Sequence, residues 1–338
     1  MINPLRNPST IRDVARQAGV SVATVSRVIN HNTPVSEEVE QRVRQVMRDL
    51  HYFPKAAARN LSTQKTNAIG FILYDMIGGF FAPLLSGIEM YASQHGYQLL
   101  IATTRYQYTS GGFPLPLGPH NTDGLLIYAN SLPEDRIRAL HDLSYPMVLI
   151  HRTPPQNLNI PSVTIENKQA TEDAVSHLIK THHRKRIVLL RGPQAEEDSH
   201  WRELGYFEAH TKYDLPVAEE LLLPGEFSQE VAFNSICRLV ENKIPFDAIF
   251  SGDDEGAVGA LNALNHCGIR CPQDVSLIGF DDQNIAACLS PQLTTVHAPT
   301  QDVGRVAAEQ LINILNGEIP DSLTLLPTQM VIRKSCGC

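Results

Sequence analysis

The chain has 338 residues, of which 43% are hydrophobic, and a formal net charge of −8. This length exceeds one average domain, and the composition supplies enough apolar side chains for a substantial core. No apolar run approaches the ~20 residues of a membrane span, and the N-terminus lacks the apolar region of a signal peptide. We therefore expect a cytoplasmic protein of two or three domains that does not contact a membrane.

Residues 10–35 predict two short helices joined by a tight turn. Thr10 is placed to cap the first helix, with Asp13 completing an acidic capping box, and Gly19 supplies the left-handed turn after it. Ser21 then caps a second helix over about 21–30. This helix turns five side chains outward: Val22, Ala23, Ser26, Arg27 and Asn30. Such a pair of helices presents side chains to the DNA major groove as a helix-turn-helix does.

The charge distribution supports a DNA-binding head. Residues 1–66 contain ten Lys and Arg against five Asp and Glu, whereas the remaining residues contain 18 and 31. A basic head on an acidic body suits a head that meets phosphates. A third helix is predicted to start at Ser36. The alternative for this segment is a generic three-helix bundle that binds protein.

Residues 51–66 predict a linker with a short helix. The segment from Lys55 to Leu61 has high helix propensity but only about two turns, and such a helix is marginal alone in water. We expect it to be disordered without DNA and to fold on binding. Lys55, Arg59 and Lys65 can meet phosphates. Leu61 is a candidate wedge for a minor-groove base step, and its alternative role is packing against the body.

From residue 67 onward, unbroken apolar runs alternate with helical patterns, which predicts parallel sheets covered on both faces. The expected strands are 68–73, 98–102, 124–128, 147–150, 187–190, 248–250 and 275–280. The expected helices are 83–95, 134–143, 168–182, 229–241, 255–267 and 301–316. These are too many for one small domain. We expect two similar α/β lobes with a cleft between them.

Polar residues follow several of these strands, where ligands of parallel sheets bind. They are Asp75, Asp253 and Asp281, with Phe80 and Phe227 in nearby loops and Arg202 after an RGP turn. Carboxylates accept hydrogen bonds from hydroxyls, and aromatic faces stack on C–H-rich rings. This combination favours a sugar or similar polyol. For each acid taken singly, the alternative is a loop cap or a surface charge.

The six cysteines give no strong signal for a metal. Four lie within the α/β segments, where a reduced core cysteine is usual. Cys336 and Cys338 at the tail could bind metal or form a disulfide, but no histidine lies near them in sequence to complete a zinc set. We therefore expect a frayed tail with free thiols, no metal site and no cofactor.

Two other classes of protein share some of these sequence features. A sugar-binding transport module would share the body but should lack the basic head and carry a secretion signal. An enzyme is disfavoured because the sequence has no Walker loop, no GxGxxG after a strand, no HExxH and no GxSxG. The paired acids Asp253/Asp254 and Asp281/Asp282 are compatible with a glycosidase, but their place at strand ends of a cleft favours binding.

Three motifs resemble the LacI/GalR family of bacterial transcriptional regulators, in that family's order. TIRDVARQAGVSVATVSRVIN resembles its DNA-binding signature. PKAAARNLS resembles its hinge helix, with Leu61 at the wedge position. CPQDVSLIGFDD followed by SPQLTTVHAP resembles the second lobe and the crossover back to the first. The resemblance covers essentially the whole chain.

The resemblance implies a helix-turn-helix head and a body like periplasmic sugar-binding proteins, in which the chain crosses between the lobes more than once. It also implies a homodimer on a pseudo-palindromic operator, with a tetramer left open. The implied segments are a head over 1–50, a hinge over 51–66, an N-terminal lobe over 67–165 and 298–327, and a C-terminal lobe over 166–297 and 328–338.

Site residues follow from the same resemblance, residue by residue. Base-reading positions are occupied by Val22, Ala23 and Arg27. Positions that contact the DNA backbone are occupied by Thr10, Ser21, Asn30 and Tyr52. Effector-contacting positions are occupied by Phe80, Arg202, Phe227, Asp253 and Asp281. We expect a repressor, not an enzyme, whose operator affinity is set by a small ligand. A sugar is favoured over a purine, and inducer or corepressor action stays open.

The sequence departs from the family pattern at three places. His151 stands where an aspartate is usual, which puts a titratable group in or near the cleft. Asp253 stands where an asparagine is common. Residues 109–124 contain three prolines and four glycines where the family has a helix, so we predict a loop there. This loop alters either the dimer face of the first lobe or the rim of the cleft.

Overall fold

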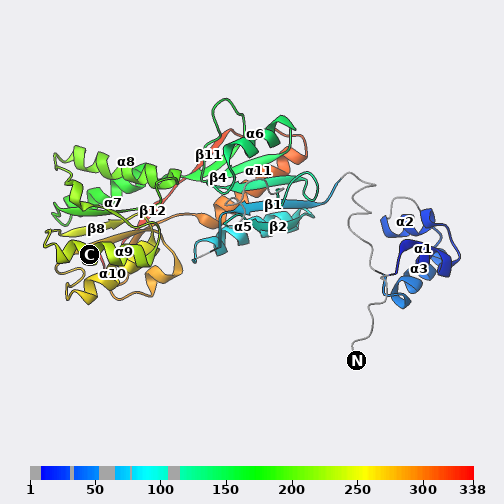
Figure 1. The fold of residues 1–338 in the computed structure, drawn as a ribbon, viewed down its shortest axis with the longest axis horizontal. Helices are drawn as coiled ribbons and strands as arrows, with labels where there is room; N and C mark the ends of the chain where they lie inside the picture. Colours follow the sequence, from blue (N-terminus) through cyan, green and yellow to red (C-terminus); the bar gives the residue numbers. More distant parts are fainter. Residues whose placement is uncertain (1–8, 31–33, 53–64, 77, 106–114) are drawn as a thin grey trace. The chain divides into compact units, whose positions relative to one another are not determined.

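The computed structural model describes residues 9–30, 34–52, 65–76, 78–105 and 115–338 (Figure 1). The chain divides into two compact units, Met1–Thr66 and Asn67–Cys338. The predicted hinge helix, with Lys55, Arg59 and Leu61, lies outside the described residues. No helix in the described part of the chain is long and apolar enough to cross a lipid bilayer.

The first unit is a three-helix head, and its helices are α1 (Ile11–Ala18), α2 (Val22–Asn30) and α3 (Glu37–Asp49). Small apolar side chains from all three helices form its core, in which Val14, Val25 and Val43 are fully buried. The predicted caps and helices of the head are therefore confirmed.

The second unit contains two six-stranded sheets. The first sheet is parallel throughout and has the strand order β11-β5-β4-β3-β1-β2. Its strands are β1 (Ala68–Leu73), β2 (Gln98–Thr103), β3 (Gly124–Tyr128), β4 (Met147–Ile150), β5 (Ser162–Ile165) and β11 (Leu323–Leu326).

The second sheet has the order β12-β10-β9-β8-β6-β7 and is parallel except where β12 pairs antiparallel with β10. Its strands are β6 (Ile187–Arg191), β7 (Leu222–Pro224), β8 (Ala248–Ser251), β9 (Ser276–Asp281), β10 (Thr294–His297) and β12 (Gln329–Val331). The two sheets together confirm the predicted fold class of two open, mainly parallel sheets.

Helices cover both faces of each sheet, as Figure 1 shows. Both faces need cover because successive side chains of a strand point to opposite faces of the sheet. In β6, Ile187 and Leu189 pack in one hydrophobic cluster, and Val188 and Leu190 pack in the other. The helices of the body are α5 (Phe81–Gln94), α6 (Glu134–Asp142), α7 (Lys168–Lys180), α8 (Glu197–Lys212), α9 (Gln229–Glu241), α10 (Asp254–His266) and α11 (Thr300–Leu315). Short 3-10 turns lie at Glu219–Leu221 and Asn284–Ala287.

The chain crosses from one sheet to the other after β5, after β10 and after β11. Each sheet therefore contains strands from distant parts of the sequence. The predicted strands and helices of the body are all present, with ends that differ by a few residues. The sequence pattern did not predict α8 or five short strands, which are β5, β7, β10, β11 and β12.

The proline- and glycine-rich segment contains no helix or strand over its described part, residues 115–123. Asn121 accepts a hydrogen bond from the Gly118 amide (3.0 Å), and the Thr122 hydroxyl donates to the Gly118 carbonyl (3.1 Å). The Tyr145 hydroxyl then donates to the Thr122 carbonyl (2.7 Å). The predicted loop is confirmed for these residues.

Helices α5 and α11 pack at very short range because each has a glycine at the crossing. A Cβ atom on Gly87 would overlap the Gln301 carbonyl oxygen and lie 2.9 Å from the Arg305 nitrogen. A Cβ atom on Gly304 would overlap the Leu84 carbonyl oxygen. These contacts hold α11, which follows the crossing after β10, against α5.

We expect Gly87→Ala to lower stability. Alanine would favour the helix by up to ~1 kcal/mol, but overpacking typically costs about 1–3 kcal/mol. The added methyl group would overlap backbone atoms of α11, which cannot move aside as a side chain can. The midpoint of urea unfolding by circular dichroism checks this, with Ser93→Ala on the exposed side of α5 as the control. A Gly87→Ala protein as stable as the parent would contradict the close packing.

Candidate functional site

The turn of the head is built from the residues that its sequence predicts. Thr10 accepts a hydrogen bond from the Asp13 amide, and the Asp13 carboxylate accepts from the Thr10 amide (3.0 Å), which completes the capping box. Gly19 has φ 64° and ends α1 in the left-handed conformation. The Ser21 hydroxyl then accepts from the Thr24 amide (3.1 Å) and starts α2. These contacts fix the angle between the two helices.

The outer face of α2 exposes part of the predicted reading set. Val22 is 42% exposed, Ala23 and Arg27 are also exposed, and Ser26 is half-buried. Tyr52 packs against the head's core, and burial raises its pKa above the usual value. The side chain of Asn30 lies outside the described residues. A cation and small apolar groups on one exposed helical face can meet guanine edges and thymine methyl groups.

The body brings most of the predicted ligand-binding residues together where the strands of both sheets end. Phe80 and His151 follow β1 and β4 of the first sheet. Asp253 and Asp281 stand at the ends of β8 and β9 of the second sheet. Arg202 enters the same region from α8, a helix that the sequence analysis did not predict.

Arg202 lies at the centre of this cluster and is only 4% exposed. Its guanidinium donates to Asn167 Oδ1 (2.8 Å), to Asp281 Oδ1 (3.4 Å) and to the Gly252 carbonyl oxygen. Its guanidinium carbon also lies 3.7 Å from the centroid of the Phe280 ring and 5.7 Å from that of Phe227. Arg202 therefore joins the start of α7 to the ends of β8 and β9.

His151 connects the first sheet to the same cluster. It is 3% exposed, and its Nδ1 lies 2.7 Å from Asp198 Oδ2. Its Nε2 has no hydrogen-bond partner among the described residues. Asp198 is also 3.8 Å from Arg202. A buried polar nitrogen without a partner is costly, so a ligand that supplied one would be favoured.

Aromatic rings border the cluster on the side of the first sheet. The centroid of the Phe80 ring lies 5.9 Å from that of His151 and 6.1 Å from that of Tyr128, both edge to face. The Tyr128 and His151 centroids are 5.6 Å apart. On the side of the second sheet, the Phe227 ring fills the space beside Gly192, where any Cβ atom would overlap it. The cluster thus has apolar walls around polar groups, as ligand sites commonly do.

The electrostatics of the acids are set mainly by their burial. Burial, followed by the charge of Asp281, raises the pKa of Asp253 to about 7. Burial also raises the pKa of Asp281 to about 6, although Arg202 opposes this rise. For Asp198, burial is outweighed by His151 and Arg202, so its pKa is lowered. The site therefore holds its negative charge mostly at Asp198, beside Arg202 and His151.

Two of the predicted acids also have the structural roles that were left open. Asp253 caps α10, where it accepts from the Gly256 amide (2.9 Å). Asp75 forms an ion pair with Arg105 (3.3 Å) at the end of β1. Asp198, Asn167, Tyr128 and Phe280 belong to the cluster but were not predicted. Tyr128 and Phe280 end predicted strands and Asn167 directly precedes a predicted helix, so their positions carried a signal. Asp198 carried none because α8 was not predicted.

Cavities lie beside the cluster. One of about 540 Å³ opens between the start of α5, including Phe80, and the turn after β9, including Asp281. A second of about 290 Å³ is lined by Asn167, Asp198 and Trp201. The larger has room for a small ligand between groups carried by different sheets.

Comparison with known proteins accounts for both units. Residues 10–55 match the family model of bacterial regulatory proteins, lacI family, and residues 175–336 match that of the periplasmic binding protein-like domain. Catabolite control protein A of Priestia megaterium is 34% identical over 330 residues, 96% of this chain and 98% of that protein. The repressor CytR of Escherichia coli K12 is 32% identical over 97% of this chain and 96% of its own.

The chain belongs to the lacI family of bacterial regulatory proteins.

Solved structures of this lacI family agree with the fold. The structure of transcriptional regulator CelR with cellobiose has a TM-score of 0.71 at 26% identity, covering 97% of this chain and 99% of that one. The Lac repressor dimer bound to operator and the anti-inducer ONPF has a TM-score of 0.82 at 24% identity, covering 98% and 99%. The second likeness is one of fold alone.

As a lacI-family member, the protein is a DNA-binding transcriptional regulator with a ligand-binding domain and is not an enzyme. The geometry of the paired acids agrees with this conclusion. Asp254 accepts hydrogen bonds from the Thr295 hydroxyl (2.6 Å) and the Gln283 amide (2.7 Å), and Asp282 pairs with Arg333 (2.6 Å). These carboxylates hold loops and strands together.

We expect Asp253→Asn to stabilise the protein at pH 8 and to change its stability little at pH 4. The pKa of Asp253 is about 7 in the folded state and 3.8 in the unfolded state. The folded protein that carries Asp253 therefore becomes less stable as the pH rises from 3.8 to 7. Asparagine still caps the helix and carries no charge.

Urea unfolding at both pH values checks this prediction. Asp135→Asn, which removes an exposed carboxylate from the first turn of α6, is the control for loss of one charge near a helix start. A stability difference between parent and Asp253→Asn that is the same at pH 4 and pH 8 would contradict the prediction.

Proposed function

We propose that this regulator is a repressor that acts as a homodimer and that a sugar or sugar derivative controls its affinity for operator DNA. The proposed ligand binds between the two sheets, at the cluster around Arg202. The observation that carries the proposal is the buried guanidinium of Arg202, which is shared among partners at the ends of β8 and β9 and at the start of α7.

The chemistry of the cluster suits a hydroxyl-rich ligand. Carboxylate oxygens of Asp253 and Asp281 accept hydrogen bonds from hydroxyls, and at neutral pH their raised pKa values also leave a fraction protonated as donors. Phe80 and Phe227 offer faces for the C–H side of a sugar ring. Nε2 of His151 offers one more polar partner. The effector residues proposed are therefore these five together with Arg202 and Asp75.

One of these relatives is solved with a sugar. CelR is solved with cellobiose, whereas the name of the repressor PurR from Edwardsiella ictaluri, 29% identical, states no ligand. A purine could also stack on Phe80 or Phe227. The acids favour a sugar here, because a purine has fewer groups that donate to carboxylates than a polyol has hydroxyls.

Allosteric control requires a ligand that binds two arrangements of the lobes unequally. The close contact of His151 Nδ1 with Asp198 Oδ2 (2.7 Å) joins the residue that follows β4 of the first sheet to α8 beside the second sheet. A ligand that hydrogen-bonds to His151 and Arg202 would compete with such contacts or reinforce them. In our proposal, this changes how the two first lobes of the dimer sit and whether the hinge segments can bind DNA.

We expect uncharged sugars to raise the thermal unfolding midpoint in a screen that also includes sugar phosphates, nucleosides and purines. A ligand at about 100 times its Kd adds roughly 2.7 kcal/mol of stability. Phe80→Ala should weaken this effect at least tenfold in ligand concentration. Phe233→Ala, which changes a half-buried residue of α9 that packs against the core of the second lobe, is the control and should retain it. A shift only with purines would refute the sugar proposal.

We also expect Arg27→Ala to weaken operator binding by about 1–3 kcal/mol and to relax specificity at one base position, as loss of an arginine–guanine contact does. The operator would first be selected from random-sequence DNA, and binding measured by fluorescence anisotropy. Arg42→Ala, an exposed arginine on α3, is the control for loss of charge. Equal weakening on operator and random DNA for Arg27→Ala would contradict base reading.

A further inference from the structure

The C-terminal tail is an integral part of the second lobe, which corrects the expectation of a frayed end. Cys336 and Ser335 are fully buried. The Ser335 hydroxyl donates to the Leu277 carbonyl (2.6 Å) and accepts from the Thr294 amide (2.8 Å). The Ser276 hydroxyl donates to the Cys336 carbonyl (2.7 Å). The tail is thereby held beside β9 and β10, and its thiols have defined positions.

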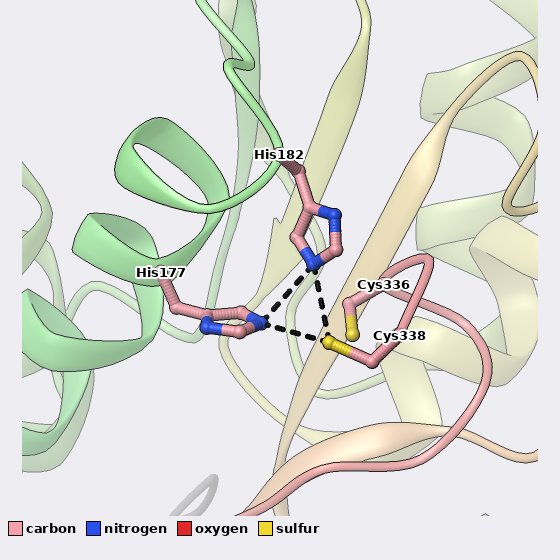
Figure 2. A group of neighbouring side chains, drawn as sticks. All are labelled: His177, His182, Cys336 and Cys338. Carbon is pink, nitrogen blue, oxygen red and sulfur yellow. Dashed lines mark hydrogen bonds between the residues drawn. The ribbon is translucent and has the colours of Figure 1, made fainter.

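Two histidines that are distant in sequence lie beside these thiols (Figure 2). His177 is in the last turn of α7, and His182 is in the loop that leads to β6. The ligating atoms of His177, His182, Cys336 and Cys338 all lie within 4.8 Å of one another. Figure 2 shows the side chains pointing toward a common centre from α7, its following loop and the tail.

The distances between these atoms match the edges of a zinc tetrahedron. With Zn–N near 2.05 Å and Zn–S near 2.3 Å, tetrahedral geometry places two nitrogens about 3.3 Å apart and a nitrogen and a sulfur about 3.5 Å apart. The two Nε2 atoms are 3.2 Å apart. Cys338 Sγ lies 3.4 Å from Nε2 of His182 and 3.5 Å from that of His177. Three edges therefore already have the required lengths.

Further contacts orient the first ligands, as is usual around metal sites. The other ring nitrogen of His177, Nδ1, lies 3.3 Å from the Thr181 hydroxyl. With Nδ1–H directed at that oxygen, the lone pair of Nε2 faces the other three ligands. The Thr294 hydroxyl donates to Cys336 Sγ (3.2 Å), which suits a thiolate. The two Nε2 atoms and Cys338 Sγ make three close contacts with one another. Without a metal, each of these contacts would need its own proton to be a hydrogen bond, and few protons are available on these atoms.

Gly337 allows the two cysteines to face the same point. Its φ of 110° lies in the left-handed region, which suits glycine. A Cβ atom there would lie 3.3 Å from Nδ1 of His182. The Cys-Gly-Cys sequence therefore combines two soft ligands with the one residue type that lets them turn inward beside a histidine.

We propose that His177, His182, Cys336 and Cys338 bind one Zn²⁺ ion in a closed, structural site that fastens the C-terminus to α7. Two imidazoles and two thiolates form a Cys₂His₂ set, which is typical of structural zinc and leaves no open position for catalysis. Binding releases the two thiol protons to solvent, with no change of oxidation state. The site is separate from the operator and effector sites proposed above, so its test is independent of them.

The test uses full-length protein without a polyhistidine tag, purified under reducing conditions, loaded with Zn²⁺ and desalted. Mass spectrometry of the metal content should give one zinc per chain. Co²⁺ in its place should give the ligand-field bands of a tetrahedral site and a sulfur-to-cobalt charge-transfer band. Removal of zinc by a chelator should lower the thermal unfolding midpoint, and added Zn²⁺ should restore it.

Variants assign the ligands. Cys338 is exposed and His182 is half-buried, so the Cys338→Ser and His182→Ala proteins should both fold. Each substitution should weaken zinc binding at least tenfold, measured by competition with a chromophoric chelator. Cys288→Ser and His266→Ala are the matched controls, since both residues are exposed and His266 also ends a helix. The controls should keep one zinc per chain and the cobalt spectrum.

Three results would overturn the proposal. The first is a parent protein that retains no zinc after loading. The second is full zinc binding by both Cys338→Ser and His182→Ala. The third is a Cys336–Cys338 disulfide in the reduced preparation, seen as an intact mass lower by two hydrogens together with loss of two titratable thiols.

Discussion

The body of this regulator depends on one buried cation. The Arg202 guanidinium is held by Asn167, Asp281 and the Gly252 carbonyl and lies over the Phe280 ring. A buried charge is tolerated only when it is paired and fully hydrogen-bonded, and breaking such a pair typically costs about 3–5 kcal/mol. The ends of β8 and β9, the start of α7 and the middle of α8 must therefore keep their relative positions, and the aromatic walls are arranged around them.

This arrangement also limits the charge of any occupant. Arg202 is already opposed by Asp198, whereas burial favours the neutral forms of Asp253 and Asp281. A strongly charged ligand would have to displace one of these partners and leave the other charge without compensation. An uncharged, polar ligand exchanges hydrogen bonds without disturbing this balance. The pocket's chemistry and the protein's stability are thus controlled by the same few groups.

The fold was largely predictable from periodicity, because the longer strands are unbroken apolar runs and the head carries its caps in sequence. Helix α8 was not, since its buried face places Asp198, Ser199 and Arg202 where an amphipathic pattern requires apolar residues. That exception falls at the proposed ligand site, and functional sites are where local rules are expected to fail. The cluster at the tail was not predicted because its histidines and cysteines are far apart in the sequence and come together only in the fold. Asp253, which the sequence marks as a candidate ligand-binding residue, serves as a helix cap in the structure.

The last strands of the chain complete both sheets. β11 forms the edge of the first sheet beside β5, and β12 pairs with β10 at the edge of the second. During synthesis from the N-terminus, the head can form early from local contacts alone. Neither lobe can complete its sheet until residues 323–331 have been synthesised. A nascent chain would thus have a folded DNA-binding head before its body is complete, so the proposed control over DNA binding begins only after β11 and β12 have joined their sheets.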